Sequence, residues 1–138
     1  MMVVDASMSL AWVLPGEATD ATEAILEDVA EGGAMAPALW PTEVLNALIV
    51  ALRRERIDDD ALAEAMHELA ALPIEIASTR LATEGGHVTA LARRHGLSAY
   101  DAAYLELAVR LAAPLATLDA DLIRAAKAED VRVVAAPR

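Results

Sequence analysis

Residues 2–13 read MVVDASMSLAWV, and this stretch decides the class of fold. The apolar run at residues 2–4, which contains two β-branched valines, predicts a strand that ends at Asp5. The apolar residues 7–13 then predict a buried helical segment, which the Pro-Gly pair at residues 15–16 interrupts. The chain therefore opens with a short strand that is followed directly by a helix.

The same alternation of strand and helix continues to the end of the sequence. Apolar periodicity predicts further helices over residues 17–31, 41–53, 59–72, 80–95, 98–112 and 119–129. Short strands are predicted at residues 35–36, 74–76, 115–118 and 131–134. Strands that alternate with helices favour an α/β fold, with a short parallel central sheet of about four to five strands surrounded by helices.

The composition limits the chemistry that is open to this chain. Hydrophobic residues make up 57% of the sequence but aromatic residues only 3%, so Ala, Leu, Val and Ile must fill the core. No apolar run approaches the roughly 20 residues of a membrane span, and no signal-peptide pattern is present, so we expect a cytoplasmic protein without membrane contact. Cysteine is absent, which leaves oxygen ligands for any hard metal ion.

The net charge of −11 argues against a protein that binds nucleic acid through a broad basic surface. A nucleic-acid enzyme with this charge would need bound divalent cations to offset its acidic residues locally. A basic partner protein could cover the rest of the acidic surface.

Four acidic residues lie where strands end or helices begin. Asp5 and Asp119 each follow a predicted strand, and Glu43 and Asp101 lie in the first turn of a predicted helix. In an open α/β sheet these places converge on one crevice. An acid at a helix start also caps the helix or complements its dipole, so each residue taken alone has a structural explanation.

Two of these acids share a helix face with residues typical of a core. The positions three, four and seven residues later are Asn46, Ala47 and Val50 for Glu43, and Tyr104, Leu105 and Ala108 for Asp101. We therefore expect both carboxylates to be partly desolvated and to need a compensating cation. Mg²⁺ needs only a few carboxylates together with water and phosphate, so the four carboxyl groups should converge within metal-bridging distance.

Four segments in order resemble the PIN domains of VapC-type toxins over nearly the whole chain. They read VVDAS at residues 3–7, EVLN at 43–46, SAYDAAYLELA at 98–108 and LATLDADL at 115–122. The resemblance implies a single PIN-like domain over residues 1–138, and a ribonuclease that hydrolyses RNA phosphodiester bonds with Mg²⁺ or Mn²⁺. It implies that the catalytic and metal-binding residues are Asp5, Glu43, Asp101 and Asp119, with Ser7, Asn46, Thr117 and Asp121 in supporting roles.

The resemblance also implies the partners of such a toxin. It points to an RNA substrate, to a homodimer, and to a cognate antitoxin whose tail blocks the acidic site. An acidic toxin and a basic inhibitor are electrostatically complementary. The sequence does not identify the RNA that is cut or the antitoxin.

Two other functions stay open at this point. The chain could be a noncatalytic dimeric interaction module with Ala-rich helices. It could also be a phosphoryl-transfer protein that forms an aspartyl-phosphate at Asp5. That function calls for a lysine at a strand end, whereas the sole lysine, Lys127, lies inside a predicted helix.

The basic residues form two clusters, which are Arg53, Arg54 and Arg56, and Arg93, Arg94 and His95. They could guide an RNA backbone toward the acids. Because both clusters lie near predicted helix C-termini, the favoured interpretation is that they offset the helix dipole.

Overall fold

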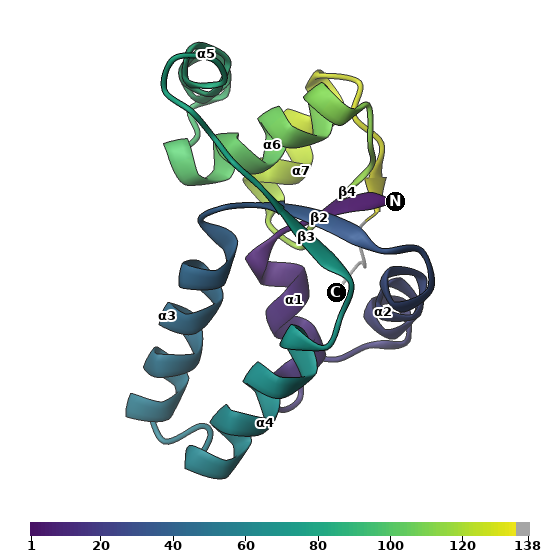
Figure 1. Cartoon of the computed structure of the whole chain (residues 1–138), viewed down its shortest axis with the longest axis vertical. Helices are drawn as coiled ribbons and strands as arrows, with labels where there is room; N and C mark the ends of the chain where they lie inside the picture. The colour runs from purple at the N-terminus through teal and green to yellow at the C-terminus, as the bar shows by residue number, and fades with distance from the viewer. Residues whose placement is uncertain (135–138) are drawn as a thin grey trace.

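A computed structural model describes residues 1–134 and contains one parallel sheet of five strands in the order β3-β2-β1-β4-β5 (Figure 1). The strands are β1 (Met2–Val4), β2 (Ala34–Pro37), β3 (Ile74–Ala77), β4 (Leu115–Ala116) and β5 (Val133–Val134). The helices are α1 (Ala6–Val13), α2 (Asp20–Gly32), α3 (Trp40–Arg53), α4 (Asp59–Ala70), α5 (Gly85–His95), α6 (Ala99–Leu111) and α7 (Ala120–Ala128). The predicted α/β class with a short parallel sheet is confirmed.

The sheet lies between two groups of helices. Figure 1 shows α5, α6 and α7 on one side, and α1, α2, α3 and α4 on the other, with α3 and α4 extending away from the sheet as a pair. Strand β1 is fully buried between them, as the run of apolar residues at its position requires. No helix in the described part of the chain is long and apolar enough to cross a membrane.

Strand order reverses at β1, and this reversal positions the candidate site. The chain places β2 and β3 on one side of β1, and β4 and β5 on the other. Val4 pairs with Ala116, so the residues that follow them, Asp5 and Thr117, leave the sheet side by side. Ligands of open α/β sheets bind outside the carboxyl ends of the strands at such a switch point.

The two tryptophans belong to the core and have bonded ring nitrogens. Trp12 donates a hydrogen bond from Nε1 to the Thr22 carbonyl (2.9 Å), and Trp40 donates one to Ser9 Oγ (2.9 Å). Both are buried, and aliphatic side chains fill most of the remaining core. This agrees with the core expected from a composition so poor in aromatic residues.

The predicted helix at residues 80–95 begins later than expected, at Gly85. Before it, the Glu84 carboxylate accepts hydrogen bonds from the Arg80 backbone N–H (3.0 Å) and from the Thr83 hydroxyl. These bonds hold the segment in a turn. A side chain that satisfies nearby backbone donors competes with the helix, and apolar periodicity does not reveal this competition.

Other predicted elements are also shorter in the structure, including the last strand, which was predicted at residues 131–134 and covers only Val133–Val134. Helix α2 begins at Asp20, because the Thr19 side chain caps it by accepting a hydrogen bond from the Thr22 N–H (3.1 Å). The predicted strand at residues 115–118 ends at Ala116, since the chain then turns so that Thr117 can bond its neighbours.

Candidate active site

Asp5 is a buried carboxylate at the carboxyl end of the central strand. Its side chain caps α1 by accepting a hydrogen bond from the Met8 N–H (2.9 Å), and the residue is only 4% exposed. The hydroxyls of Ser7 (2.8 Å) and Thr117 (2.5 Å) also donate to it. Burial raises the pKa of Asp5 to about 6, although these hydrogen bonds act in the opposite direction.

The same two hydroxyls attach the loop after β4 to Asp5. Ser7 Oγ accepts a hydrogen bond from the Leu118 N–H (2.9 Å), and Thr117 Oγ1 accepts one from the Asp119 N–H (3.0 Å). Asp119 is thereby held near Asp5, and its negative charge contributes to the raised pKa of Asp5. One of its carboxylate oxygens, Oδ1, caps α7.

Glu43 is positioned from the opposite side by a buried tyrosine. The Tyr104 hydroxyl donates a hydrogen bond to Glu43 Oε1 (2.6 Å) and joins α6 to the first turn of α3. Burial, followed by the bond to Glu43 and the charges of Glu43, Asp5 and Asp101, raises the pKa of Tyr104 well above its usual value. The phenol therefore stays protonated and lies among three of the four acids.

Asp101 lies near two of the other predicted acids, Glu43 and Asp119. It lies half-buried in the first turn of α6, where its backbone N–H donates to the capping Ser98 hydroxyl (3.1 Å). Burial raises the pKa of Asp101, and the charges of Asp119, Glu43 and Asp121 raise it further. The structure thus brings the four predicted acids into one electrostatically coupled group.

The helix faces expected for two of these acids are only partly as predicted. Tyr104, Leu105 and Ala108 are buried, so the expectation for Asp101 is confirmed. The face expected to be core-like for Glu43 is less buried than predicted, since Asn46 is exposed and Ala47 and Val50 are only half-buried. The buried residues of α3 are Trp40, Val44, Leu48 and Ala51. Glu43 lies one position, about 100°, from this stripe, because a helix turns once every 3.6 residues or so.

The carboxylates do not form a complete metal cage. Among residues 1–134, no three His, Cys, Asp or Glu side chains lie in an arrangement that could hold a metal ion. The expected convergence of all four carboxyl groups within metal-bridging distance is therefore not found.

The donor set nevertheless fits a hard divalent cation. Its members offer carboxylate oxygens, and Mg²⁺ is usually held by one or two carboxylates with water and phosphate completing the shell. None of the four acids forms an ion pair with Arg, Lys or His within the described residues. A coupled group of acids without a cationic side chain is one that a metal ion would stabilise.

The supporting residues occupy different places. Ser7 and Thr117 bind Asp5 directly, whereas Asn46 is exposed on α3 beside Glu43. Asp121 lies at the outside of the site with a side chain that is 75% exposed and 3.6 Å from Arg124.

Sequence reasoning missed the role of the Tyr104 hydroxyl. The residue was identified only as part of an apolar face. A tyrosine on a face of Ala and Leu carries a polar tip that needs a partner when it is buried, and this is the signal that could have revealed the bond to Glu43.

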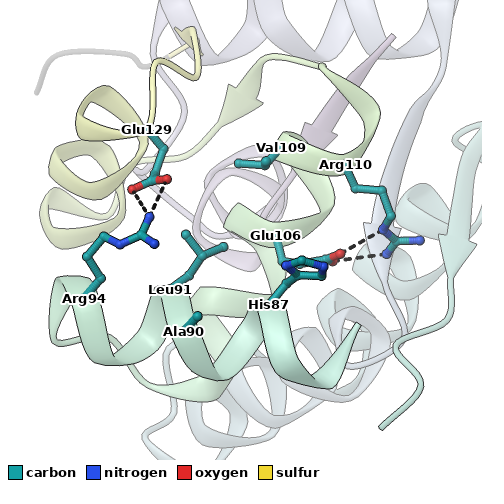
Figure 2. Close-up of a pocket in the computed structure, with 8 residues that line it drawn as sticks. All are labelled: His87, Ala90, Leu91, Arg94, Glu106, Val109, Arg110 and Glu129. Atoms are coloured by element: carbon teal, nitrogen blue, oxygen red, sulfur yellow. Dashed lines mark hydrogen bonds and ion pairs between the residues drawn. The ribbon is translucent and has the colours of Figure 1, made fainter. Parts of the chain in front are cut away.

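A second acidic group includes Glu106, which lies further along α6 than Asp101, and it differs from the four acids chemically. Figure 2 shows it around a pocket of about 380 Å³, where Arg110 Nε is 2.9 Å from Glu106 and Arg94 is 2.9 Å from Glu129. His95 also bonds Glu129 (2.6 Å). Because these carboxylates are already paired with cationic side chains, this pocket does not share the unpaired charge of the site at Asp5.

The basic clusters lie at helix ends, as predicted. Arg53 is in the last turn of α3, and Arg93, Arg94 and His95 form the last turn of α5. Cations at these positions offset the helix dipole. The bonds of Arg94 and His95 to Glu129 add a second structural role.

Comparison with known proteins gives consistent matches over the chain. Residues 2–128 match the family model described as "PIN domain". The chain is 31% identical over 121 residues to Ribonuclease VapC3 of Pyrobaculum aerophilum, an alignment that covers 88% of this chain and 91% of that protein.

Solved structures share the fold at lower identity. PAE2754 from Pyrobaculum aerophilum has a TM-score of 0.67 at 23% identity, with 96% of this chain and 88% of that chain covered. FitAcB from Neisseria gonorrhoeae has a TM-score of 0.67 at 18% identity, with 96% of both chains covered. FitAB bound to the IR36 DNA fragment has a TM-score of 0.61 at 18% identity, with 98% and 94% covered.

Proposed function

Because this chain belongs to the PIN-domain family, we propose that it is a metal-dependent endoribonuclease that acts as the toxin of a toxin–antitoxin pair. One observation carries the proposal: Asp5, buried at the end of the central strand with its pKa raised to about 6, lies among acids that have no cationic partner in residues 1–134. The name of the relative Ribonuclease VapC3 supports ribonuclease as the class of activity.

The proposed metal ion is Mg²⁺ or Mn²⁺, and it would be held by carboxylates from among Asp5, Glu43, Asp101 and Asp119, with water and phosphate completing its shell. When bound, such an ion supplies charge neutralisation at the phosphate and lowers the pKa of water. Without a cation, the four carboxylates repel the phosphates of RNA, so RNA binding at this edge of the sheet should depend on the metal.

The remaining residues of the site act by orientation. The hydroxyls of Ser7 and Thr117 fix the Asp5 carboxylate from two directions, and both also bind the loop that carries Asp119. Tyr104 holds Glu43 at the junction of α3 and α6. A catalytic group that is already held by hydrogen bonds has little orientational freedom left to lose when substrate binds.

The proposal extends to partners and location. We infer that the chain forms a single PIN-like domain and a homodimer, acts on RNA in the cytoplasm, and is inhibited by a cognate antitoxin. The net charge of −11 supports an inhibitor with a basic tail, since opposite charges steer association and add specificity.

The aspartyl-phosphate alternative gains nothing from the structure. Asp5 is almost fully buried and bonded at both carboxylate oxygens. Lys127 is an exposed residue in the last turn of α7, at the opposite end of that helix from Asp119. The alternative of a noncatalytic module is decided by the following experiment.

Purified wild-type protein is incubated with structured and unstructured RNAs in Mg²⁺ or in EDTA, beside the variants Asp5→Asn and Asp101→Asn. We expect cleavage only with metal, and a cleavage rate at least about 100-fold lower in each variant. Substitution of residues that merely hydrogen-bond to metal ligands already lowers metal affinity or activity by about 10- to 100-fold. Asp28→Asn, an exposed change on α2, is the matched control. Cleavage in EDTA, or variants as active as wild type, would overturn the proposal.

A further inference from the structure

Tyr100 is the exposed member of a small set of aromatic side chains. The chain has two Trp, two Tyr and no Phe. Trp12, Trp40 and Tyr104 are buried, and each donates a hydrogen bond inside the protein. Tyr100, in contrast, is 66% exposed. Its ring therefore contributes little to the core, although it lies in the first turn of α6.

The position of Tyr100 connects it with the proposed active site. It directly precedes Asp101, and it lines a hollow of about 450 Å³ with Leu39, Thr42, Glu43 and Asn46. Glu43 belongs both to this hollow and to the acidic group through its bond with Tyr104. The hollow therefore borders the acidic group through Glu43.

The side chains of the hollow suit a nucleobase. The Tyr100 ring offers an aromatic face, and every base has a face that can stack on it. The Asn46 amide and the Thr42 hydroxyl can each both donate and accept hydrogen bonds, as base edges require. Leu39 adds apolar surface.

The charge of the chain makes an uncharged contact valuable here. Carboxylates surround the site and the net charge is −11, so phosphate contacts alone would hold RNA poorly. Arg94 and His95 are bonded to Glu129, away from this hollow. Stacking on a neutral ring strengthens RNA binding without a basic surface.

We propose that Tyr100 stacks with an unpaired nucleobase next to the phosphodiester bond that is cut, with Asn46 contacting the edge of that base. In a duplex, each base is already stacked and paired, so its face is closed to the tyrosine. The inference rests on the proposed ribonuclease function and names the substrate feature that the site recognises.

The test compares Tyr100→Ala, Tyr100→Phe and Tyr100→Trp in cleavage of a single-stranded RNA with Mg²⁺. One lost base stack weakens binding by about 5- to 150-fold. Tyr100→Ala should therefore raise KM about tenfold with little change in kcat, while Phe and Trp should retain the wild-type KM. Leu111→Ala is the matched control, because Leu111 is also exposed on α6 but lies at its other end.

A series of RNAs with one base removed at each position in turn identifies the stacked base. Removal at one position should raise the wild-type KM by the same factor as Tyr100→Ala, and that effect should vanish in the Ala variant. An unchanged KM for Tyr100→Ala would overturn the inference about Tyr100 and leave the proposed function standing. The same holds if the removal of each base still raises KM in the Tyr100→Ala variant as it does in the wild type. Failure of the wild-type protein to cleave any RNA would overturn the proposed function and this inference with it.

Discussion

Replacing Asp5 by asparagine should stabilise the folded protein above pH 6, although it removes a proposed metal ligand. Burial raises the pKa of Asp5 from 3.8 to about 6, so ionisation of this carboxyl is unfavourable in the folded state. The amide has no charge to desolvate. It keeps an oxygen that can cap α1 at the Met8 N–H, and the hydroxyls of Ser7 and Thr117 can turn to accept its N–H.

The magnitude follows from the two pKa values. At about 1.4 kcal/mol per pKa unit, the difference corresponds to roughly 3 kcal/mol of stability. The folded state of the wild type binds the Asp5 proton more tightly than the unfolded state, so this stability is present below pH 4. It is lost as the pH rises through 6. The variant lacks this dependence, and its advantage should grow from near zero at pH 4 to about 3 kcal/mol at pH 8.

Urea unfolding without divalent metal, repeated between pH 4 and 8, measures this difference. Asp28→Asn, on the exposed surface of α2, retains Asp5 and should follow the wild-type dependence on pH. Addition of Mg²⁺ should stabilise the wild type more than Asp5→Asn, because the variant has lost a ligand. Parallel curves for wild type and Asp5→Asn, or a variant that is less stable at pH 8, would refute the reasoning.

Three further outcomes are expected. Tyr104→Phe should lower the free energy of unfolding by about 2 kcal/mol in urea and slow RNA cleavage, since it removes the hydrogen bond to the Glu43 carboxylate; equal cleavage rates would contradict the role given to Tyr104. Arg110→Met should lower the free energy of unfolding by about 2 kcal/mol, because buried Glu106 loses a partly exposed partner, yet RNA cleavage should be unchanged. A large loss of cleavage would connect the pocket lined by Glu106 and Arg110 to catalysis. Millimolar Mg²⁺ should raise the Tm of the wild type reversibly, and a Tm insensitive to both Mg²⁺ and EDTA would count against a metal site.

The succession of elements was predictable because their boundaries have local causes. The β-branched residues of β1, the caps Asp5 and Asp119, and the Gly and Pro breaks all act within a few residues. The start of α5 was not predictable in this way. There, Glu84 uses its carboxylate to close a turn at a place where the apolar pattern continues smoothly into the helix.

The site was predictable in its members more than in its geometry. The strand-end positions of Asp5 and Asp119 follow from the topology of a parallel sheet. The bond between Tyr104 and Glu43 joins residues 61 positions apart and depends on how α6 packs near α3, which no local pattern specifies. The partial exposure of Glu43 likewise depends on which face of α3 packs against the rest of the protein, because Glu43 lies one residue away from the buried stripe.

Titration of Mn²⁺ into the RNA-free protein, followed by calorimetry at neutral pH, measures directly whether the four acids bind a divalent cation. Wild type and Asp28→Asn should bind Mn²⁺ equally, and Asp5→Asn and Asp101→Asn should each bind at least about tenfold more weakly. Wild-type protein that binds no Mn²⁺, or an Asp5→Asn variant that binds it as tightly as wild type, would contradict a metal site at the carboxyl end of β1.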